Sequence, residues 1–141
     1  MSSKGHDFIL EMIQIRMRQM GYNLLSSESH YRDIKYKIPP TVISHRPDAI
    51  GYNSNTNSIC VGEAKYYGDL NSDRSQTQIK DFIGLANDRK RDINIIFGIP
   101  LSQEIHFQKI LRKNDLELNQ KIIILKIPDR LIPQEKENEE T

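Results

Sequence analysis

Residues 48–65 of the chain read DAIGYNSNTNSICVGEAK: two short apolar segments on either side of a run of Asn, Ser and Thr. Small polar residues of this kind favour a tight turn, and the flanking β-branched and aromatic residues are typical of strands. The stretch therefore predicts a β-hairpin. A turn centred in the middle of the polar run sets three cross-strand pairs: Tyr52 with Ile59, Ile50 with Val61, and Asp48 with Glu63.

Asp48, Glu63 and Lys65 are expected on one face of this hairpin. Residues two apart on a strand project from the same side, so Glu63 and Lys65 are neighbours, and the register adds Asp48. Two carboxylates at cross-strand distance repel each other unless a cation lies between them. Mg²⁺ binds oxygen ligands from one or two carboxylates together with water and phosphate. The pattern therefore predicts a divalent-metal site with a lysine beside it.

Pro47-Asp48, the hairpin and Glu63-Ala64-Lys65 resemble the PD-(D/E)XK motif of the restriction-endonuclease-like nucleases, which hydrolyse nucleic-acid phosphodiester bonds with Mg²⁺. The resemblance implies an α/β fold with a central mixed β-sheet flanked by helices. It implies that Asp48 and Glu63 bind Mg²⁺ together with the carbonyl of Ala64, and that Mn²⁺ can substitute. Lys65 would orient or help deprotonate the attacking water and stabilise the charge that develops on the phosphate.

Glu11 is a further candidate ligand. Residues 5–20 predict a helix that is apolar over most of its circumference and carries one narrow polar line, formed by Asp7, Glu11, Gln14 and Arg18. In the resembling nucleases an acidic residue on the first helix often completes the metal site, and Glu11 is the position that corresponds here. The alternative is that Glu11 faces water.

Gln78 is a candidate on a later helix, which we expect to begin near Ser75 as its cap. The run from Gln78 to Phe82 resembles the Gln-x-x-x-Tyr signature that follows the catalytic strand in several nuclease families of this fold, with Phe in the aromatic position. Gln78 would orient the site or contact the phosphate backbone. The alternative is a solvated helix residue.

Other segments predict an alternation of strands and helices. We expect extended segments at 22–25 and 33–38, a short helix at 102–111, and strands at 93–99 and 121–127. The last two are almost continuously apolar, which indicates strands buried on both faces, with 93–99 in the middle of the sheet.

Length and composition predict one domain, residues 1–132, which the resemblance implies is a nuclease domain, followed by an acidic disordered tail, residues 133–141. No stretch is long and apolar enough to span a membrane, and the N-terminus lacks a signal-peptide pattern, so we expect a cytoplasmic protein without a membrane partner.

Cys60, the single cysteine, is expected to be a small core residue. The four histidines are expected at the surface: His6, His30, His45 and His106.

The charge is compatible with a DNA partner. The net charge is +1, and the tail holds four acids and one base, which leaves about +4 on the remainder. Basic residues that would contact phosphates are Arg16, Arg18, Lys35, Lys37 and Arg89-Lys90-Arg91, with a solvated surface as the alternative. The small size and the lack of an appended DNA-binding domain are similar to Holliday-junction resolvases, which are compact dimers of this fold. A homodimer would set two sites against two strands.

The expected function is thus a Mg²⁺-dependent DNA endonuclease, with the resolvases as the most similar small members. Alternatives are a sequence-specific restriction or homing endonuclease of the same fold, a non-catalytic DNA-binding module, and an α/β domain whose carboxylates are structural. Intact Asp48, Glu63 and Lys65 speak against a decayed site. A buried pair of acids with one lysine would leave charge uncompensated, which speaks against a structural role.

Overall fold

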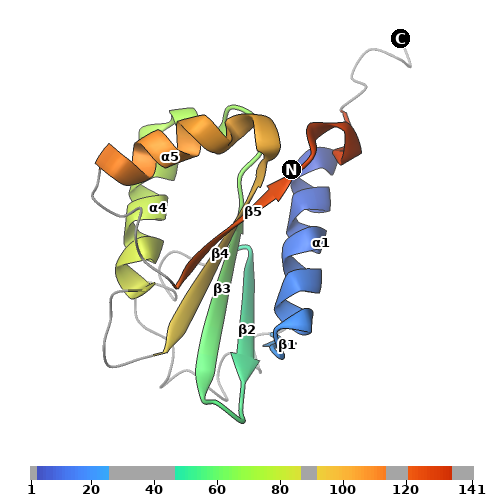
Figure 1. Cartoon of the computed structure of the whole chain (residues 1–141), viewed down its shortest axis with the longest axis vertical. Coiled ribbons are helices and arrows are strands. Elements are labelled where there is room, and N and C mark those ends of the chain that lie inside the picture. The colour runs from blue at the N-terminus through green and yellow to red at the C-terminus, as the bar shows by residue number, and fades with distance from the viewer. Residues whose placement is uncertain (1–2, 26–46, 87–91, 114–120, 135–141) are drawn as a thin grey trace.

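The computed structural model describes residues 3–25, 47–86, 92–113 and 121–134. They form an α/β structure built on a mixed five-stranded sheet, with one helix against one face and two helices against the other (Figure 1). The helices are α1 (Lys4–Gln19), α4 (Asp73–Ala86) and α5 (Glu104–Lys113). In spatial order the strands are β1 (Asn23–Leu24), β2 (Ala49–Asn53), β3 (Ser58–Ala64), β4 (Ile93–Pro100) and β5 (Ile122–Ile127).

The predicted hairpin is present, with the predicted register. β2 and β3 are antiparallel, and the ladder includes the pairs Tyr52 with Ile59 and Ile50 with Val61. The Asn53 side chain closes the turn by accepting the backbone N–H groups of Asn55 at 3.0 Å and Thr56 at 3.3 Å. Side-chain oxygens of Asn bind nearby backbone in this way, which is why Asn favours turns.

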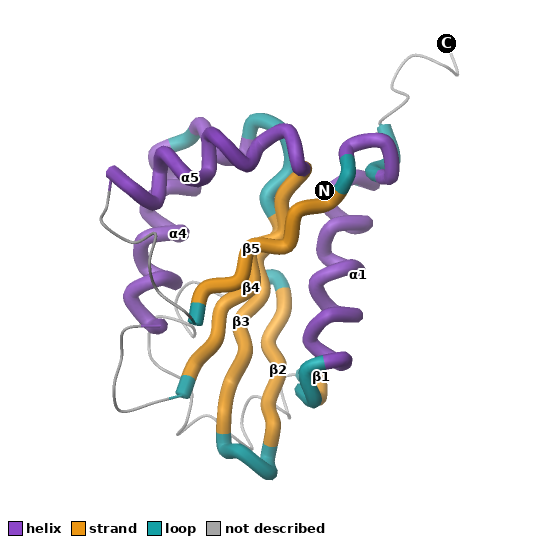
Figure 2. Tube along the Cα trace, in the orientation of Figure 1, coloured by secondary structure: helices purple, strands orange, loops and turns teal. Residues whose placement is uncertain are grey.

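The sheet divides the core into two apolar layers. Figure 2 shows α1 on one side of the strands and α4 and α5 on the other. The layer beneath α4 and α5 contains Phe82, Phe97 and Phe107, and the layer beneath α1 contains Ile9, Ile13 and Met17, all fully buried. Side chains of β3 alternate between the two layers, as a strand requires. Ile59 and Val61 belong to the α4 side, whereas Cys60 and Ala64 belong to the α1 side. Cys60 is a buried core residue, as predicted.

α1 lies very close to the sheet because β4 has a glycine beneath it. A Cβ atom at Gly98 would lie 2.7 Å from Cγ2 of Ile9 and 2.8 Å from Cδ1 of Ile13. Both distances are shorter than two carbon atoms can approach without repulsion, so no larger residue fits unless the helix shifts. Gly98 therefore helps to set the height of α1 above the sheet.

Two expectations about elements are corrected. β4 is an interior strand, as predicted, because it pairs with β3 and β5 in parallel. β5 forms one edge of the described sheet, so its residues 122–125 are half-buried rather than enclosed on both faces. α4 begins at Asp73, and the Ser72 hydroxyl accepts the Ser75 N–H at 3.1 Å, so Ser72 has the capping role expected of Ser75.

The segments after β3, β4 and β5 are tied together by one carboxylate. Asp129 accepts the Ser102 N–H at 2.9 Å and the Ser102 hydroxyl at 2.5 Å, and it accepts a further hydrogen bond from the Tyr67 hydroxyl. Tyr67 follows β3, Ser102 follows β4 and Asp129 follows β5. These bonds connect the carboxyl ends of the three parallel strands, the edge of the sheet where Glu63 and Lys65 lie.

Some expectations concern residues outside the described ranges: the extended segment 33–38, tail residues 135–141, His30, His45, Lys35, Lys37 and the Arg89-Lys90-Arg91 cluster. Among the helices that the structure describes, none combines the length and apolar character needed to cross a bilayer.

Candidate functional site

Asp48, Glu63 and Lys65 come together where β3 ends. The Ala64 N–H donates to Asp48 Oδ2 at 2.8 Å, and the Asp48 N–H donates to Glu63 Oε1 at 3.1 Å. These reciprocal bonds continue the hairpin pairing beyond its last ladder pair, Ala49 with Gly62. Glu63 and Lys65 follow Ile59 and Val61 in the alternation of β3, so both are on the α4 side of the sheet.

The surroundings of the two carboxyl groups shift their pKa values in opposite directions. Burial, aided by the bond to Asp48 and its charge, raises the pKa of Glu63 to about 8. Burial acts in the same direction on Asp48, but hydrogen bonds from His6, Glu63 and the Ala64 N–H together hold the pKa of Asp48 below its ordinary value. Glu63 is 5% exposed, so water screens this pair poorly. A proton on Glu63, or a cation between the two groups, relieves their repulsion.

Lys65 is buried and has three oxygen neighbours. Its Nζ lies 3.1 Å from Gln78 Oε1, 3.3 Å from Ser75 Oγ and 3.7 Å from Glu63 Oε2. Ser75 and Gln78 are three residues apart on α4 and therefore share one side of that helix. The ammonium group donates hydrogen bonds to Ser75 and Gln78, whereas its contact with Glu63 is an ion pair that is too long for a hydrogen bond. The Lys65 ammonium is thus fixed between the carboxylate pair and α4.

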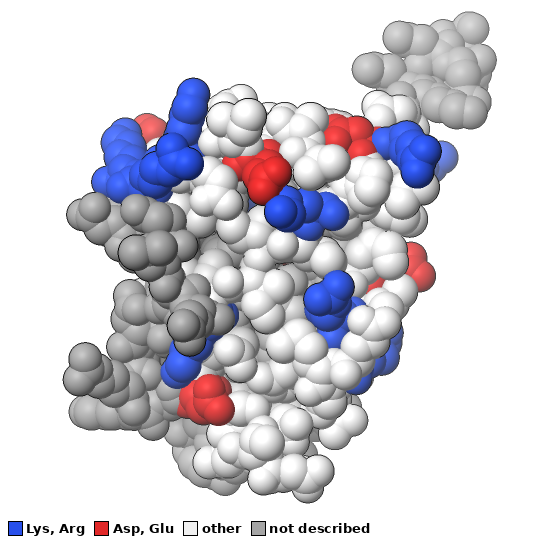
Figure 3. Space-filling model, viewed as in Figure 1, with Lys and Arg blue, Asp and Glu red and all other residues white. Residues whose placement is uncertain are grey.

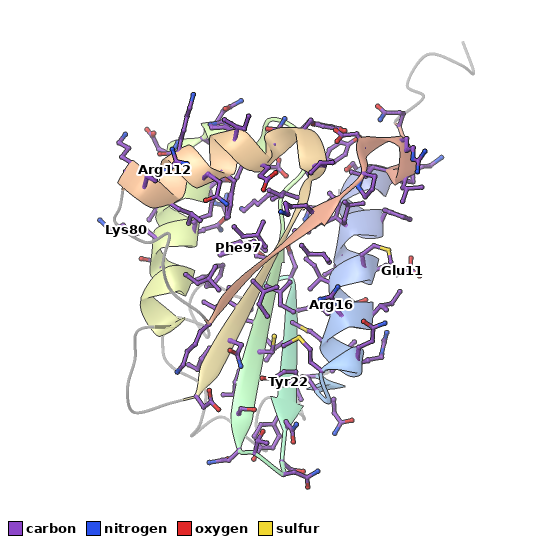
Figure 4. All side chains as sticks on the ribbon, in the orientation of Figure 1. Glu11, Arg16, Tyr22, Lys80, Phe97 and Arg112 are labelled. Atoms are coloured by element: carbon purple, nitrogen blue, oxygen red, sulfur yellow. The ribbon has the colours of Figure 1, made fainter. Side chains whose placement is uncertain are left out.

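Gln78 lies in the cluster, where its Oε1 accepts from Lys65, and Glu11 does not. Glu11 is exposed and lies on the side of α1 away from the sheet (Figure 4). The opposite side of α1 carries Ile9, Ile13 and Met17, whose burial determines the rotation of the helix about its axis. Glu11 therefore has the solvent-facing position that was its alternative.

Sequence reasoning missed two residues of the cluster, His6 and Ser75. His6 was expected at the surface, but its side chain is only 23% exposed and its Nε2 lies 3.4 Å from Asp48 Oδ2. The hydrogen bond to Asp48 raises the pKa of His6 above its ordinary value. No sequence signal pointed to His6, whereas the spacing of Ser75 from Gln78 could have indicated a shared face.

The carboxylate oxygens of Asp48 and Glu63 are the type of ligand that Mg²⁺ prefers. Within the described ranges, no group of three or more His, Cys, Asp and Glu side chains is arranged to hold a metal ion. Asp48 and Glu63 nevertheless form a carboxylate pair, and Mg²⁺ in proteins often takes one or two carboxylates and completes its shell with water and phosphate oxygens. A divalent cation would also relieve the repulsion that contributes to the raised pKa of Glu63.

Lys and Arg side chains are visible at several separate places on the face of the molecule drawn in Figure 3. Lys109, Arg112 and Lys113 are exposed on α5, and Arg16 and Arg18 are exposed on α1. A groove between α4 and α5 is lined by Asp73, Gln76, Thr77, Lys80 and Lys113. The helical period puts the α4 residues of this groove on the side of α4 opposite Ser75 and Gln78. The groove is therefore separate from the cluster.

No protein-family model, curated protein or solved structure matches this chain. Support for a function therefore comes from the geometry of the cluster. The buried carboxyl group of Glu63 and the more exposed carboxylate of Asp48, beside the buried Lys65 ammonium group, can bind a hard cation and can stabilise negative charge on an oxygen-rich substrate such as a phosphate.

Proposed function

We propose that this protein is a Mg²⁺-dependent DNA endonuclease with a restriction-endonuclease-like fold. The observation that carries the proposal is the convergence of Asp48, Glu63 and Lys65 at the end of β3. A buried carboxyl group next to a like charge, as Glu63 is next to Asp48, is costly in a purely structural role, and strongly perturbed carboxyl pKa values such as that of Glu63 are concentrated at functional sites. The α/β architecture, with the motif on a hairpin between helical layers, agrees with the same proposal.

Each residue then has a chemical role. Asp48 and Glu63 hold the cation together with the Ala64 carbonyl, and Mn²⁺ can replace Mg²⁺. The bound ion supplies Lewis-acid polarisation of the phosphate and a water molecule of lowered pKa. Lys65 orients the attacking water and stabilises the phosphate charge. Ser75 and Gln78 position the Lys65 ammonium.

The proposed substrate is duplex or branched DNA, and the proposed active form is a homodimer. One site of this kind cuts one strand, so a two-fold symmetric pair would act on both strands of a duplex or on two strands of a junction. A Holliday-junction resolvase is the proposed subclass, and a restriction or homing enzyme would use the same chemistry on a linear site.

The test is cleavage of a labelled panel containing linear duplex, single strand, flap and four-way junction, with Mg²⁺, Mn²⁺ or EDTA. We expect metal-dependent cutting that Asp48→Asn and Lys65→Met abolish. Glu11→Gln is the matched acid-to-amide control, and it should cut like the wild type because Glu11 faces solvent. Symmetric incision of the junction alone would identify a resolvase.

Two results would contradict the proposal. Cutting by Asp48→Asn at the wild-type rate would remove Asp48 from the site. DNA binding without cleavage of any panel member, or of a wider set of duplex sequences, would favour the non-catalytic binding module.

A further inference from the structure

His6 is held firmly in the first turn of α1. Ser3 is the N-cap of this helix, and its hydroxyl accepts the His6 backbone N–H at 3.0 Å. Such a cap stabilises the first turn, where a helix otherwise frays. The imidazole reaches from there to the carboxylate of Asp48, with Nε2 at 3.4 Å from Oδ2.

The chemistry of the two groups determines which of them carries the proton in this contact. Asp48 Oδ2 already accepts the Ala64 N–H, and an ionised carboxylate oxygen can only accept, so the proton lies on His6 Nε2. The other ring nitrogen, Nδ1, is buried and has no hydrogen-bond partner among the described residues. Its distance to Asp7 Oδ1, 3.9 Å, exceeds that of a hydrogen bond. Within the described structure, the closest polar contact of the imidazole is therefore the one between Nε2 and Asp48 Oδ2, at 3.4 Å.

Gly5 explains how α1 comes near enough for this contact. A Cβ atom at Gly5 would lie 2.2 Å from Cε1 of Tyr66, so the Tyr66 ring occupies the space that any side chain would need. Tyr66 directly follows Lys65. The first turn of α1 thus packs against the residue that follows Lys65 of the proposed active site. This packing places His6 next to Asp48.

We propose that His6 is a positioning residue of the metal site: its Nε2–H holds Asp48 through Oδ2, in the orientation that directs this carboxylate toward Glu63. The inference rests on the proposed function, because it takes Asp48 to be a metal ligand. Hydrogen-bond partners of metal ligands fix ligand orientation, and their loss commonly costs 10- to 100-fold in metal affinity or activity. α1 would then contribute to the site through a hydrogen bond from a histidine, with Glu11 taking no part.

Mn²⁺ binding, measured by calorimetry and by electron paramagnetic resonance of the free ion, tests this role without relying on activity. We expect His6→Ala to weaken Mn²⁺ binding by about 10-fold or more. His6→Gln, which keeps a side-chain N–H donor, should recover part of that loss. His106→Ala, on α5, is the matched histidine control and should bind like the wild type. Circular dichroism and melting curves of each variant check that the fold is intact.

The outcomes separate this inference from the proposed function. Wild-type affinity in folded His6→Ala would overturn the role of His6 alone, provided that Asp48→Ala abolishes binding. If His6→Ala and His6→Gln both lose Mn²⁺ binding as completely as Asp48→Ala does, His6 is itself a metal ligand. That result also overturns the positioning role. If the wild type binds no Mn²⁺, both the site and the role of His6 are wrong.

Discussion

At the scale of single residues, the three motif side chains depend on neighbours that the motif does not include. Asp48 is bonded to the Ala64 N–H and contacted by His6, and Lys65 is bonded to Ser75 and Gln78. A buried ammonium group needs such partners because burial removes the water molecules that would otherwise accept its hydrogen bonds. The precision of the proposed site therefore depends on α1 and α4 as much as on the hairpin.

Ser75→Ala should lower the rate of the chemical step. The variant removes one of the three oxygens around Lys65 Nζ, and a hydrogen bond to a charged group is worth about 1.5–3 kcal/mol. We expect kcat to fall by about 10-fold or more while KM changes little, because the lost interaction orients Lys65 and does not bind DNA. Thr77→Ala, a matched hydroxyl deletion on the exposed side of α4, should leave both constants unchanged. Equal losses in the two variants would contradict this role for Ser75.

Cys60 should be unreactive in the folded protein. Burial raises the pKa of the Cys60 thiol to about 12, so the nucleophilic thiolate is almost absent at pH 8. Because the folded state holds this proton more tightly than the unfolded state, its contribution to stability is complete below about pH 9 and is lost as the pH rises toward 12. Labelling with a thiol-specific disulfide reagent at pH 8 should be slow without urea and rapid with it. Rapid labelling of the native protein would show that this thiol is accessible.

At the scale of elements, the position of α1 depends on small residues beneath it. Gly98 lies under Ile9 and Ile13, and Gly5 lies against Tyr66. Close packing of this kind resists even one added methyl group, because neighbouring side chains have no space into which they can move. The contact between His6 and Asp48 is therefore a consequence of how α1 is packed along its length.

Gly98→Ala should destabilise the protein by about 1–3 kcal/mol through overpacking between β4 and α1. The control is Gly84→Ala on α4, where an added Cβ would meet nothing within 4 Å. Alanine is the better helix former, so this control should be stabilised by about 0.5–1 kcal/mol. Urea unfolding curves of the two variants measure both effects. Equal stability of Gly98→Ala and the wild type would show that α1 can shift at little cost.

At the scale of the whole molecule, the charged form of Glu63 opposes folding unless a proton or a cation neutralises it. Glu63 is buried near Asp48, and its raised pKa shows that its charged form is disfavoured in the folded state. Proteins commonly lose stability at functional sites in exchange for activity. A cation that binds the folded chain alone restores stability by mass action.

Glu63→Gln should therefore melt a few degrees above the wild type in EDTA at pH 8, since it replaces a desolvated acid by a neutral amide. Mg²⁺ should raise the melting temperature of the wild type and leave that of Glu63→Gln nearly unchanged. Thermal unfolding followed by circular dichroism measures both shifts. A lower melting temperature of the variant in EDTA, with an equal response of both proteins to Mg²⁺, would assign Glu63 a structural role.

The sequence alone determined the hairpin, its register and the approach of Asp48 to Glu63 and Lys65. These features follow from the two-residue period of strands and from the preference of Asn for turns, and both are local. It also identified β4 as an interior strand from its unbroken apolar run, although the same pattern wrongly predicted burial on both faces for β5. The assignment to the nuclease family and the proposed activity stay predictions.

Only the tertiary structure decided which helix residues reach the carboxylates. The polar line of α1 indicated Glu11, but the rotation of a helix about its axis depends on distant residues, here Gly98 beneath Ile9 and Ile13. That rotation directs Glu11 to solvent, and the packing of the first turn brings His6 to Asp48. Contacts between elements far apart in the chain depend on how they pack, which no local pattern encodes.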